Sequence, residues 1–374
     1  MKKSFKYRIY PTPSQITLLN QTLDGCRRLY NHLLGQRKEA WETEKKNLSF
    51  FDQCNTFKIL KKEQLFLKNI HSQVLQNVAA RIDLAFKAFF RRIKSGDKPG
   101  YPRFQGKERY NSFTYPQSGF SLLGNIIHLY KIGDIKVKYH RPIEGIIKTC
   151  TIRRTPTEKW FISLVCNIDN NPVKKPIKPT IGIDMGLKTF ATFSNGKHIK
   201  NPRFFRQEEK VLAKAQRKLS KQKKTSKLRT KARKVVARIH ERINWKRENF
   251  VHQKTRKIVN RFNTICVEDL SINDMKKKSF RSMNKSIGDA AWNNFLSILS
   301  FKAEWAGGRV TKVNPAFTSQ NCSRCGHRHK LKLSDRVYHC PTCDLELDRD
   351  VNAAKNIRAL GLQSLGVSIK VVSS

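Results

Sequence analysis

The chain has 374 residues, of which 76 are Lys or Arg and 28 are Asp or Glu, so its formal net charge is +48. Hydrophobic residues make up 39% of it, and the length predicts at least two folding units. It has no run of about 18 apolar residues, which excludes a membrane-spanning helix, and no signal-peptide core at its start. We expect a cytoplasmic protein whose charge is balanced by nucleic acid, because no basic amphipathic helix or lipid anchor favours a membrane.

The first hundred residues predict a strand followed by helices. Apolar residues alternate with polar ones over residues 5–9, which is typical of a strand, and Ser14 is the expected cap of the next helix. Residues 72–93 keep an apolar face at helical spacing, and the Gly/Pro-rich segment 96–102 ends the helical block. We therefore expect a helical domain over residues 11–102.

Short alternating runs replace the helical spacing between residues 103 and 172. The clearest predicted strands are residues 135–139 and 160–165. Together with residues 1–10, this segment predicts a β-barrel into which the helical domain is inserted. A Pro/Lys-rich linker over residues 170–179 follows, and beyond it the pattern becomes α/β.

The most basic segment, residues 201–260, holds 21 Lys or Arg against four Glu. A solvated charged helix and a disordered tail are the simpler interpretations of such a run. A tail would not lie between two strands of one domain, so we favour long basic helices that cross a nucleic-acid backbone.

Three carboxylates stand where elements of the α/β region end or begin. Asp184 ends a predicted strand, Glu268 ends another, and Asp350 stands at the start of a predicted helix. Each could instead be a turn or capping residue. Asp269 could take the capping role beside Glu268, and Asp348 competes with Asp350.

Three such carboxylates can converge into a divalent-metal site. Mg²⁺ prefers oxygen ligands and keeps several waters, so a few carboxylates and a substrate phosphate suffice. Two ions about 3.5–4 Å apart would activate a water and stabilise the leaving oxygen of a cleaved phosphodiester. The sequence lacks the phosphate loop of common ATPases. We therefore predict a metal-dependent nuclease.

Four cysteines near the C-terminus form two closely spaced pairs. Fourteen residues separate the first pair, Cys322 and Cys325, from the second pair, Cys340 and Cys343. Two such pairs are typical of a tetrahedral zinc site, and a closed shell of four thiolates is structural rather than catalytic. We therefore predict a structural Zn²⁺ whose binding supplies much of the folding free energy of this short segment.

Together these residues resemble the TnpB (OrfB) family, transposon-encoded proteins related to type V CRISPR effector nucleases. The resemblance covers nearly the whole chain. The matching strings are residues 8–12, 101–104, 182–186, 267–270, 318–326 and 348–357. One departure is Asp344, where the family usually has Gly after the fourth cysteine; it puts only the local turn in doubt.

The resemblance implies an α+β multidomain fold with a RuvC-like nuclease domain of RNase H topology. That domain would span residues 180–316 and 348–360, interrupted by the basic helices and by a zinc-ribbon insertion over residues 317–347. Residues 361–374 would form a tail. The β-barrel would be the family's wedge domain, and the helices its recognition domain.

Asp184, Glu268 and Asp350 fall on the three catalytic positions of the family, which implies that they bind two Mg²⁺ ions. The resemblance also implies a structured guide RNA from the protein's own element, a target DNA selected by base pairing, and one monomer per RNA. We would place such a protein in the prokaryotic cytoplasm at the nucleoid.

The resemblance further implies that cleavage occurs next to a short DNA motif read by the N-terminal half. By position, Gln76, Asn111, Ser112 and Thr114 match the part that contacts this motif. Amide and hydroxyl side chains can read base edges. Gln76 is otherwise an ordinary exposed helix residue.

Three alternatives stay open at this point. The first is an RNA-guided DNA-binding repressor that does not cleave, which the presence of all three carboxylates disfavours. The second is a strand-transferring transposase, which would join DNA ends without a guide RNA. The third is a plain zinc-ribbon nucleic-acid protein, which leaves the three carboxylates unexplained.

Overall fold

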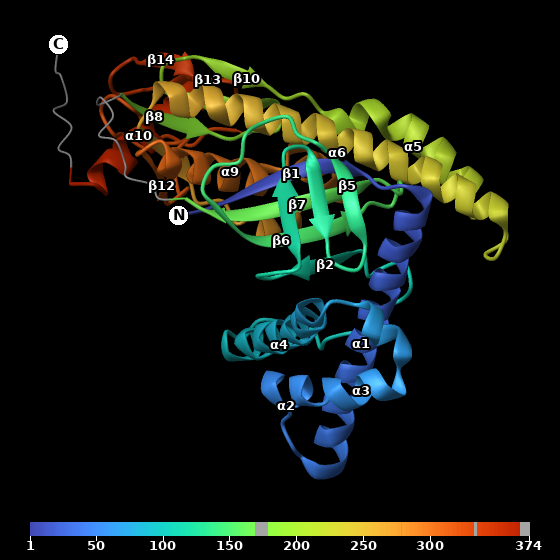
Figure 1. The fold of residues 1–374 in the computed structure, drawn as a ribbon. Coiled ribbons are helices and arrows are strands. Elements are labelled where there is room, and N and C mark those ends of the chain that lie inside the picture. Colours follow the sequence, from blue (N-terminus) through green and yellow to red (C-terminus); the bar gives the residue numbers. More distant parts are fainter. Residues whose placement is uncertain (169–178, 278, 333–334, 367–374) are drawn as a thin grey trace. The chain divides into compact units, whose positions relative to one another are not determined.

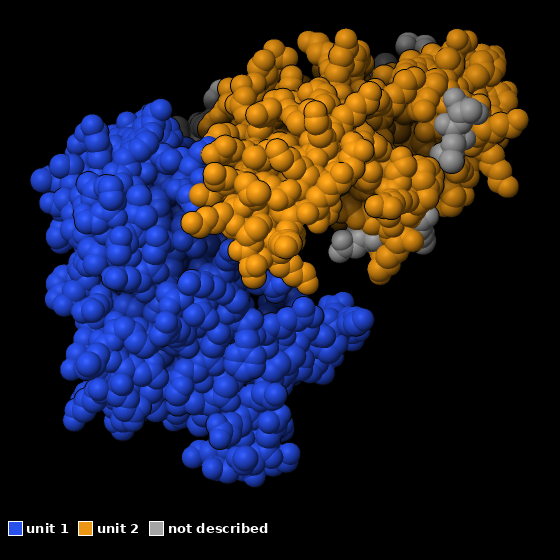
Figure 2. Space-filling view, turned by 90° about the vertical axis from the view of Figure 1, so that its right-hand side faces the viewer, with its two compact units in different colours: residues 1–170 blue, residues 171–374 orange. Residues whose placement is uncertain are grey.

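The structure is a computed structural model. It describes residues 1–168, 179–277, 279–332 and 335–366. The chain divides into two compact units, unit 1 with residues 1–170 and unit 2 with residues 171–374 (Figures 1 and 2). Most of the predicted linker over 170–179 and the end of the predicted tail over 361–374 lie outside the described residues. No helix in the described part has both the length and the apolar character needed to cross a membrane.

Unit 1 combines an antiparallel sheet of seven strands with a set of helices (Figure 1). Its strands are β1 (Lys2–Tyr10), β2 (Ser112–Tyr115), β3 (Phe120–Leu123), β4 (Ile126–Leu129), β5 (Gly133–Lys138), β6 (Ile146–Arg154) and β7 (Trp160–Asn167). Its helices are α1 (Pro13–Glu44), α2 (Phe50–Asn55), α3 (Phe57–Glu63), the 3-10 helix η1 (Leu65–Asn69) and α4 (Ser72–Lys94). The predicted strand, helical block and later strands are all confirmed.

The sheet of unit 1 is a curled half-barrel rather than the predicted closed barrel. Its strand order is β2-β6-β7-β1-β5-β4-β3, and no pairing among the described residues joins the edge strands β2 and β3. Helix α4 covers the β2 edge, where the Arg81 guanidinium donates to the Ser112 carbonyl at 2.7 Å and to Thr114 Oγ1 at 3.0 Å. A barrel closes only when strands meet edge to edge with a consistent stagger, and here a helix side chain takes up that edge.

The cap of α1 is Thr12, not Ser14. The Thr12 hydroxyl accepts from the Gln15 N–H, and the Gln15 side chain accepts from the Thr12 N–H at 3.0 Å, so the two residues form a capping box. Pro13 occupies the first helical position, where its missing N–H costs nothing. Ser14 therefore lies inside the helix, and the expectation that it caps was wrong by two positions.

The core of unit 1 is shared between the sheet and the helices. Phe5, Tyr7 and Ile9 of β1 are buried on the inner face of the sheet, as their alternation predicts. On α4, Val74 is fully buried whereas Ile93 is 48% exposed. The apolar face predicted over residues 72–93 is therefore fully buried only in the first half of the helix, and Phe86 beyond it is partly buried against the core.

Unit 2 is built around a mixed sheet in the order β10-β9-β8-β11-β12. Its strands are β8 (Thr180–Asp184), β9 (Thr189–Phe193), β10 (His198–Lys200), β11 (Thr264–Glu268), β12 (Arg309–Val313), β13 (Val337–His339) and β14 (Glu346–Asp348). Its helices are α5 (Phe204–Ser220), α6 (Lys227–Arg261), α7 (Ile272–Lys277), α8 (Arg281–Ala290), α9 (Trp292–Trp305) and α10 (Arg349–Gln363). Strands β8, β11 and β12 run parallel, while β9 and β10 are antiparallel.

Helix α10 packs closely against β8 and β11 because two glycines remove side chains from the contact. A Cβ atom at Gly182 would overlap the Ala354 carbonyl of α10, and one at Gly361 would overlap the Cys266 thiol of β11. The strands are buried on both faces, as parallel strands between helices usually are. This packing fixes the start of α10 relative to the ends of β8 and β11.

The basic segment forms two long helices, α5 and α6, as predicted (Figure 1). Leu212, Ile239 and Ile243 form a small core between them. Val235, which shares the four-residue spacing of the last two, is 46% exposed. The pair is therefore held by a short apolar seam and presents most of its cations to solvent.

Candidate functional site

The three predicted carboxylates stand at the element ends that the sequence indicates. Asp184 is the last residue of β8, Glu268 is the last residue of β11, and Asp350 lies in the first turn of α10. Since β8 and β11 are parallel neighbours, Asp184 and Glu268 meet at the same edge of the sheet. The close packing of α10 brings Asp350 to that edge.

The competition between Asp348 and Asp350 is decided by the helix cap. Asp348 Oδ1 accepts hydrogen bonds from the backbone N–H groups of Asp350 at 2.9 Å and of Val351 at 3.1 Å. Asp348 therefore satisfies the start of α10. The Asp350 carboxylate is released from capping, and its nearest cation is the Arg349 guanidinium at 3.9 Å.

The electrostatics show that Asp184 stands in the field of the other two carboxylates. Burial, followed by the charges of Glu268 and Asp350, raises the pKa of Asp184 to about 8. Burial also raises the pKa of Glu268, although the hydrogen bond from Thr318 opposes this shift. Three carboxylates at one edge repel each other, and a divalent cation is the partner that would relieve this repulsion.

The carboxylate arrangement is open rather than tight. In the described ranges, the only group of three or more Asp, Glu, His or Cys ligand atoms within 4.8 Å of one another is a cysteine cluster. The carboxylate oxygens are thus too dispersed to share one ion as a complete shell. A metal ion bound here would need waters and a substrate phosphate to complete its ligands.

Thr318 is a site residue that sequence reasoning missed. Its hydroxyl donates to Glu268 Oε1 at 2.6 Å, and both side chains are buried. The bond fixes one oxygen of Glu268 and leaves the other oxygen for a further partner. Thr318 lies in a string that carries the family resemblance, but a single threonine in a loop gives no signal of the residue it contacts.

Two asparagines of α10 connect the carboxylate edge to the cysteine segment. Asn352 is fully buried; its Oδ1 accepts from the Ser323 N–H at 2.9 Å and its Nδ2 donates to the Asn321 carbonyl at 2.8 Å. One turn later, Asn356 Nδ2 donates to the Thr318 carbonyl at 2.8 Å and to the Asn321 carbonyl at 2.7 Å. Their i, i+4 spacing in the sequence is the signal that could have found them.

The four predicted zinc ligands come together. The Sγ atoms of Cys322 and Cys343 are 3.6 Å apart, and those of Cys325 and Cys340 are 3.5 Å apart. Four thiolates about 2.3 Å from a central Zn²⁺ in a tetrahedron would be separated by about 3.8 Å. The cysteines therefore fit a zinc ion, and the two-stranded sheet of β13 and β14 holds the second pair.

The departure at Asp344 is explained by a matching turn in the first cysteine pair. Gly326 follows Cys325 with φ +77, and Asp344 follows Cys343 with φ +54, so both residues adopt left-handed backbone. In each pair the N–H of this residue donates to the carbonyl of the first cysteine at 3.0 Å. Aspartate is among the few non-glycine residues that tolerate this conformation, so the turn is preserved.

The residues predicted to contact a DNA motif lie on two packed elements of unit 1. Gln76 is exposed on α4, Asn111 precedes β2, and Ser112 and Thr114 belong to β2. Arg81 of α4 joins the last two through its guanidinium. The structure therefore brings them to one region and adds an arginine that sequence reasoning did not single out.

Three family profiles match the chain. Residues 163–279 match the OrfB/IS605 family described as a probable transposase, and residues 292–357 match a Cas12f1-like TNB domain. Residues 1–46 match a profile described as a helix-turn-helix domain. In the structure these last residues form one strand and one long helix, β1 and α1, rather than two helices joined by a turn.

Similar proteins cover nearly the whole chain. A Streptomyces pristinaespiralis protein named "Putative RNA-guided DNA endonuclease" is 34% identical over 97% of this chain and 90% of its own length. An Escherichia coli K12 protein named "Putative RNA-guided DNA endonuclease InsQ" is 29% identical over 96% of this chain and 92% of its own length.

The fold resembles that of a solved Cas12f1 protein, which was determined in a complex with sgRNA and target DNA. The TM-score is 0.58 at 14% identity, and the match covers 96% of this chain and 98% of that one. At this identity the likeness concerns the fold alone. Together with the near full-length match to the Streptomyces protein, the site residues and profiles place this chain in the TnpB (OrfB) family.

Proposed function

We propose that this protein is an RNA-guided DNA endonuclease that cleaves target DNA at a single carboxylate site. The observation that carries the proposal is the meeting of Asp184, Glu268 and Asp350 at one edge of the unit 2 sheet, where burial and mutual repulsion raise the pKa of Asp184 to about 8. The names of the Streptomyces and Escherichia relatives support the same activity.

The three carboxylates would hold Mg²⁺, and the sheet of unit 2 would correspond to a RuvC-like domain of RNase H topology. Two bound ions would supply an activated water and charge neutralisation at the leaving oxygen. The protein's own contribution is positioning. Thr318 fixes one oxygen of Glu268, Asp348 caps α10 in place of Asp350, and the glycine contacts keep α10 against the sheet.

The zinc segment would act as a structural brace for this site. A Zn²⁺ held by the four cysteines would order residues 317–347. That segment contains Thr318, and it is tied to α10 through Asn352 and Asn356. Loss of zinc would therefore affect Glu268 through the hydrogen bond from Thr318, and α10 through the four hydrogen bonds of Asn352 and Asn356.

The family resemblance implies a structured guide RNA from the protein's own element as the partner, and the charge of the chain supports a polyanion of this kind. The net charge of +48 needs a polyanion, and helices α5 and α6 present their cations to solvent. We infer one protein monomer per RNA, acting at the nucleoid of a prokaryotic cytoplasm. Gln76, Asn111, Ser112 and Thr114, with Arg81 beside them, would contact the short DNA motif that flanks the target.

Reconstitution with guide RNA tests this function. With Mg²⁺, the ribonucleoprotein should cut matched duplex DNA and leave mismatched DNA intact, and Asp184→Ala should bind the matched DNA without cutting it. Wild-type protein that binds matched DNA but never cuts it would support the repressor instead. Covalent joining of DNA ends without guide RNA would support a strand-transferring transposase.

A further inference from the structure

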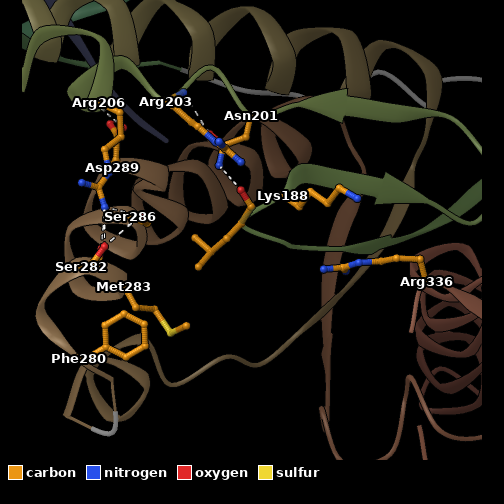
Figure 3. A pocket seen from close by; sticks show the side chains of 11 residues that line it. Lys188, Asn201, Arg203, Arg206, Phe280, Ser282, Met283, Ser286, Asp289 and Arg336 are labelled. Atoms are coloured by element: carbon orange, nitrogen blue, oxygen red, sulfur yellow. Dashed lines mark hydrogen bonds between the residues drawn. The ribbon is translucent and has the colours of Figure 1, made fainter. Parts of the chain in front are cut away.

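Unit 2 contains a cavity of about 620 Å³ beside the segments that carry the candidate catalytic residues (Figure 3). Leu187 and Lys188, which follow Asp184 in the loop after β8, form part of its wall, and Arg336 forms another part. The Arg336 carbonyl accepts the N–H of Arg349, the residue before Asp350. The cavity therefore borders the backbone segments that carry Asp184 and Asp350.

The cavity is positively charged: four cations line it, of which Arg206 is paired with Glu209. Lys188, Arg203 and Arg336 line it with exposed side chains, and within the described ranges none of them has a side-chain hydrogen bond or an ion pair. One carboxylate in the lining, Asp289, is only 3% exposed and is paired with Arg247 at 2.7 Å. Three cations without counter-charges around a cavity favour an anionic occupant.

The opposite wall is apolar and accessible. Phe280 and Met283 line the cavity with exposed fractions of 68% and 38%, and Figure 3 shows them together, away from Lys188 and Arg336. An exposed ring opposite a set of cations is the arrangement that takes a nucleotide, because the base stacks on the ring while the phosphates meet the cations. The volume lies within the usual range for small-ligand sites, roughly 300–1,000 Å³.

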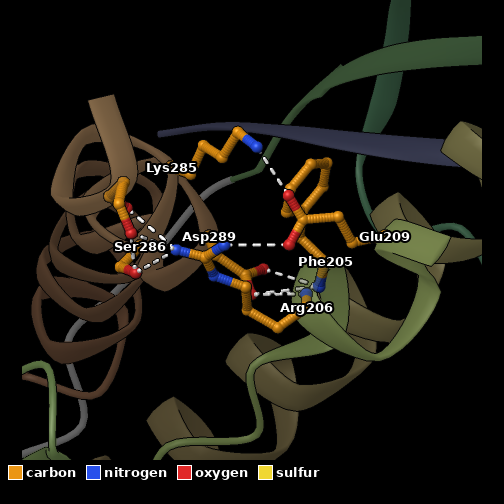
Figure 4. Close-up of polar contacts among 7 residues, drawn as sticks. Phe205, Arg206, Glu209, Lys285, Ser286 and Asp289 are labelled. Carbon is orange, nitrogen blue, oxygen red and sulfur yellow. Dashed lines mark hydrogen bonds and ion pairs between the residues drawn. The ribbon is translucent and has the colours of Figure 1, made fainter. Parts of the chain in front are cut away.

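The wall that holds Phe280 is firmly anchored (Figure 4). Asp289, at the end of α8, accepts from the backbone N–H groups of Phe205 at 3.0 Å and Arg206 at 3.4 Å, so it caps α5. The Arg206 guanidinium donates to the Ser286 hydroxyl at 3.2 Å and to Glu209 at 2.8 Å. These contacts tie α8 to α5 and fix this side of the cavity.

We propose that this cavity binds one nucleotide of the DNA strand that is cut, with the base on Phe280 and the flanking phosphates on Lys188, Arg203 and Arg336. The proposal deepens the nuclease function and rests on it for the identity of the strand. DNA is favoured over RNA because the cavity borders the segments that carry Asp184 and Asp350, where the cut strand must pass.

Photocrosslinking tests the cavity without requiring cleavage. The full-length Asp184→Ala protein is irradiated with single-stranded DNA that carries 5-iododeoxyuridine, and the adduct is located by mass spectrometry. We expect an adduct at Phe280 that survives in Phe280→Tyr. Combined replacement of Lys188, Arg203 and Arg336 by alanine should reduce its yield at least tenfold, whereas Lys210→Ala on α5 should not.

Phe301, an aromatic residue of α9 that is 44% exposed, is the matched control. Equal adduct yields at Phe301 and Phe280 would mean that any exposed ring reacts, and would overturn the proposal. The proposal would also be overturned if no adduct formed at Phe280, or if the adduct persisted when Lys188, Arg203 and Arg336 were all replaced by alanine. An adduct formed with 5-iodouridine RNA but not with DNA would assign the cavity to RNA and overturn it as stated.

Abasic scanning then connects the cavity to cleavage. In the wild-type ribonucleoprotein, one abasic position near the cut should slow cleavage by roughly 5- to 150-fold, the range expected for loss of one stacked base. In the Phe280→Ala variant, which already lacks the stacking ring, the same abasic position should reduce the cleavage rate little further. Additive effects at every position would overturn the proposal, whereas a protein that crosslinks at Phe280 but never cuts would overturn only the nuclease function.

Discussion

Two carboxylate sites of unit 2, one around Asp184 and one around Asp289, differ in the charge of their neighbours. Asp289 is almost fully buried and is surrounded by donors, with Arg247 and the start of α5 accounting for both oxygens. Asp184 faces two further carboxylates that help to raise its pKa to about 8. Both carboxylates are buried, so burial does not distinguish Asp289 from Asp184, the proposed metal ligand, whereas the sign of the surrounding charge does.

The largest expected effect tests the functional side of this comparison. Asp184→Ala should reduce cleavage of matched DNA at least about 1,000-fold, because it removes a ligand of the proposed metal site. Above about pH 8, where Asp184 is charged, the Tm should be unchanged or higher in this variant, because the repulsion by Glu268 and Asp350 is removed. Asp269→Ala is the matched control, because Asp269 is exposed, adjoins Glu268 and pairs with Lys312. Equal losses of cleavage in both variants would contradict the assignment.

The structural side is tested by Asp289→Ala. This change leaves Arg247 and the start of α5 without their acceptor, so the free energy of unfolding should fall by about 3 kcal/mol. Urea unfolding monitored by circular dichroism measures this loss. Asp289→Asn, which keeps an acceptor oxygen, should lose less. A variant that remains as stable as wild type but no longer cleaves would show that Asp289 belongs with the functional carboxylates.

Thr318 refines the comparison, because it gives Glu268 one neutral donor in an otherwise acidic site. Thr318→Val should lower the cleavage rate about tenfold and raise the Mg²⁺ concentration needed for half-maximal rate, since one charged hydrogen bond is lost. Mn²⁺ affinity gives a second readout that does not depend on cleavage. It is measured by electron paramagnetic resonance with and without Thr318→Val, in an Asp350→Asn background that is expected not to cleave. Thr318→Ser should restore both properties. If Thr318→Ser restored neither the cleavage rate nor the Mg²⁺ dependence, the packing of the Thr318 methyl group would be the important contact instead of its hydroxyl.

A pH dependence of stability tests the same comparison without any cleavage assay. The raised pKa of Asp184 means that the folded protein holds this proton more tightly than the unfolded chain, in which an aspartate has a pKa of about 3.9. Its stabilising contribution is complete below about pH 4 and is lost as the pH rises through about 8. Without added Mg²⁺, the Tm of wild type should therefore fall relative to Asp184→Asn between about pH 5 and pH 8, and added Mg²⁺ should narrow the gap. A constant difference across this range would argue against the shift.

Several features could be predicted from local patterns. The alternation in β1, the strands that end in Asp184 and Glu268, the basic helices and the two cysteine pairs all follow from spacing within short windows. Two expectations failed, one because a residue two positions away competed for the role and one because a residue of another element did. Thr12 rather than Ser14 caps α1, and the β2 edge is occupied by Arg81, so the sheet of unit 1 is not closed.

The sequence by itself determined which residue types were available and at which element ends they stand, because secondary structure depends on periodicity along the chain. Only the tertiary structure decided their roles. Thr318 reaches Glu268 across 50 residues of sequence, Asp348 takes the cap and releases Asp350, and Asp289 is neutralised by an arginine on another helix. Such contacts depend on which elements pack together in the folded protein. The spacing of residues within one segment does not indicate which other segment it will contact.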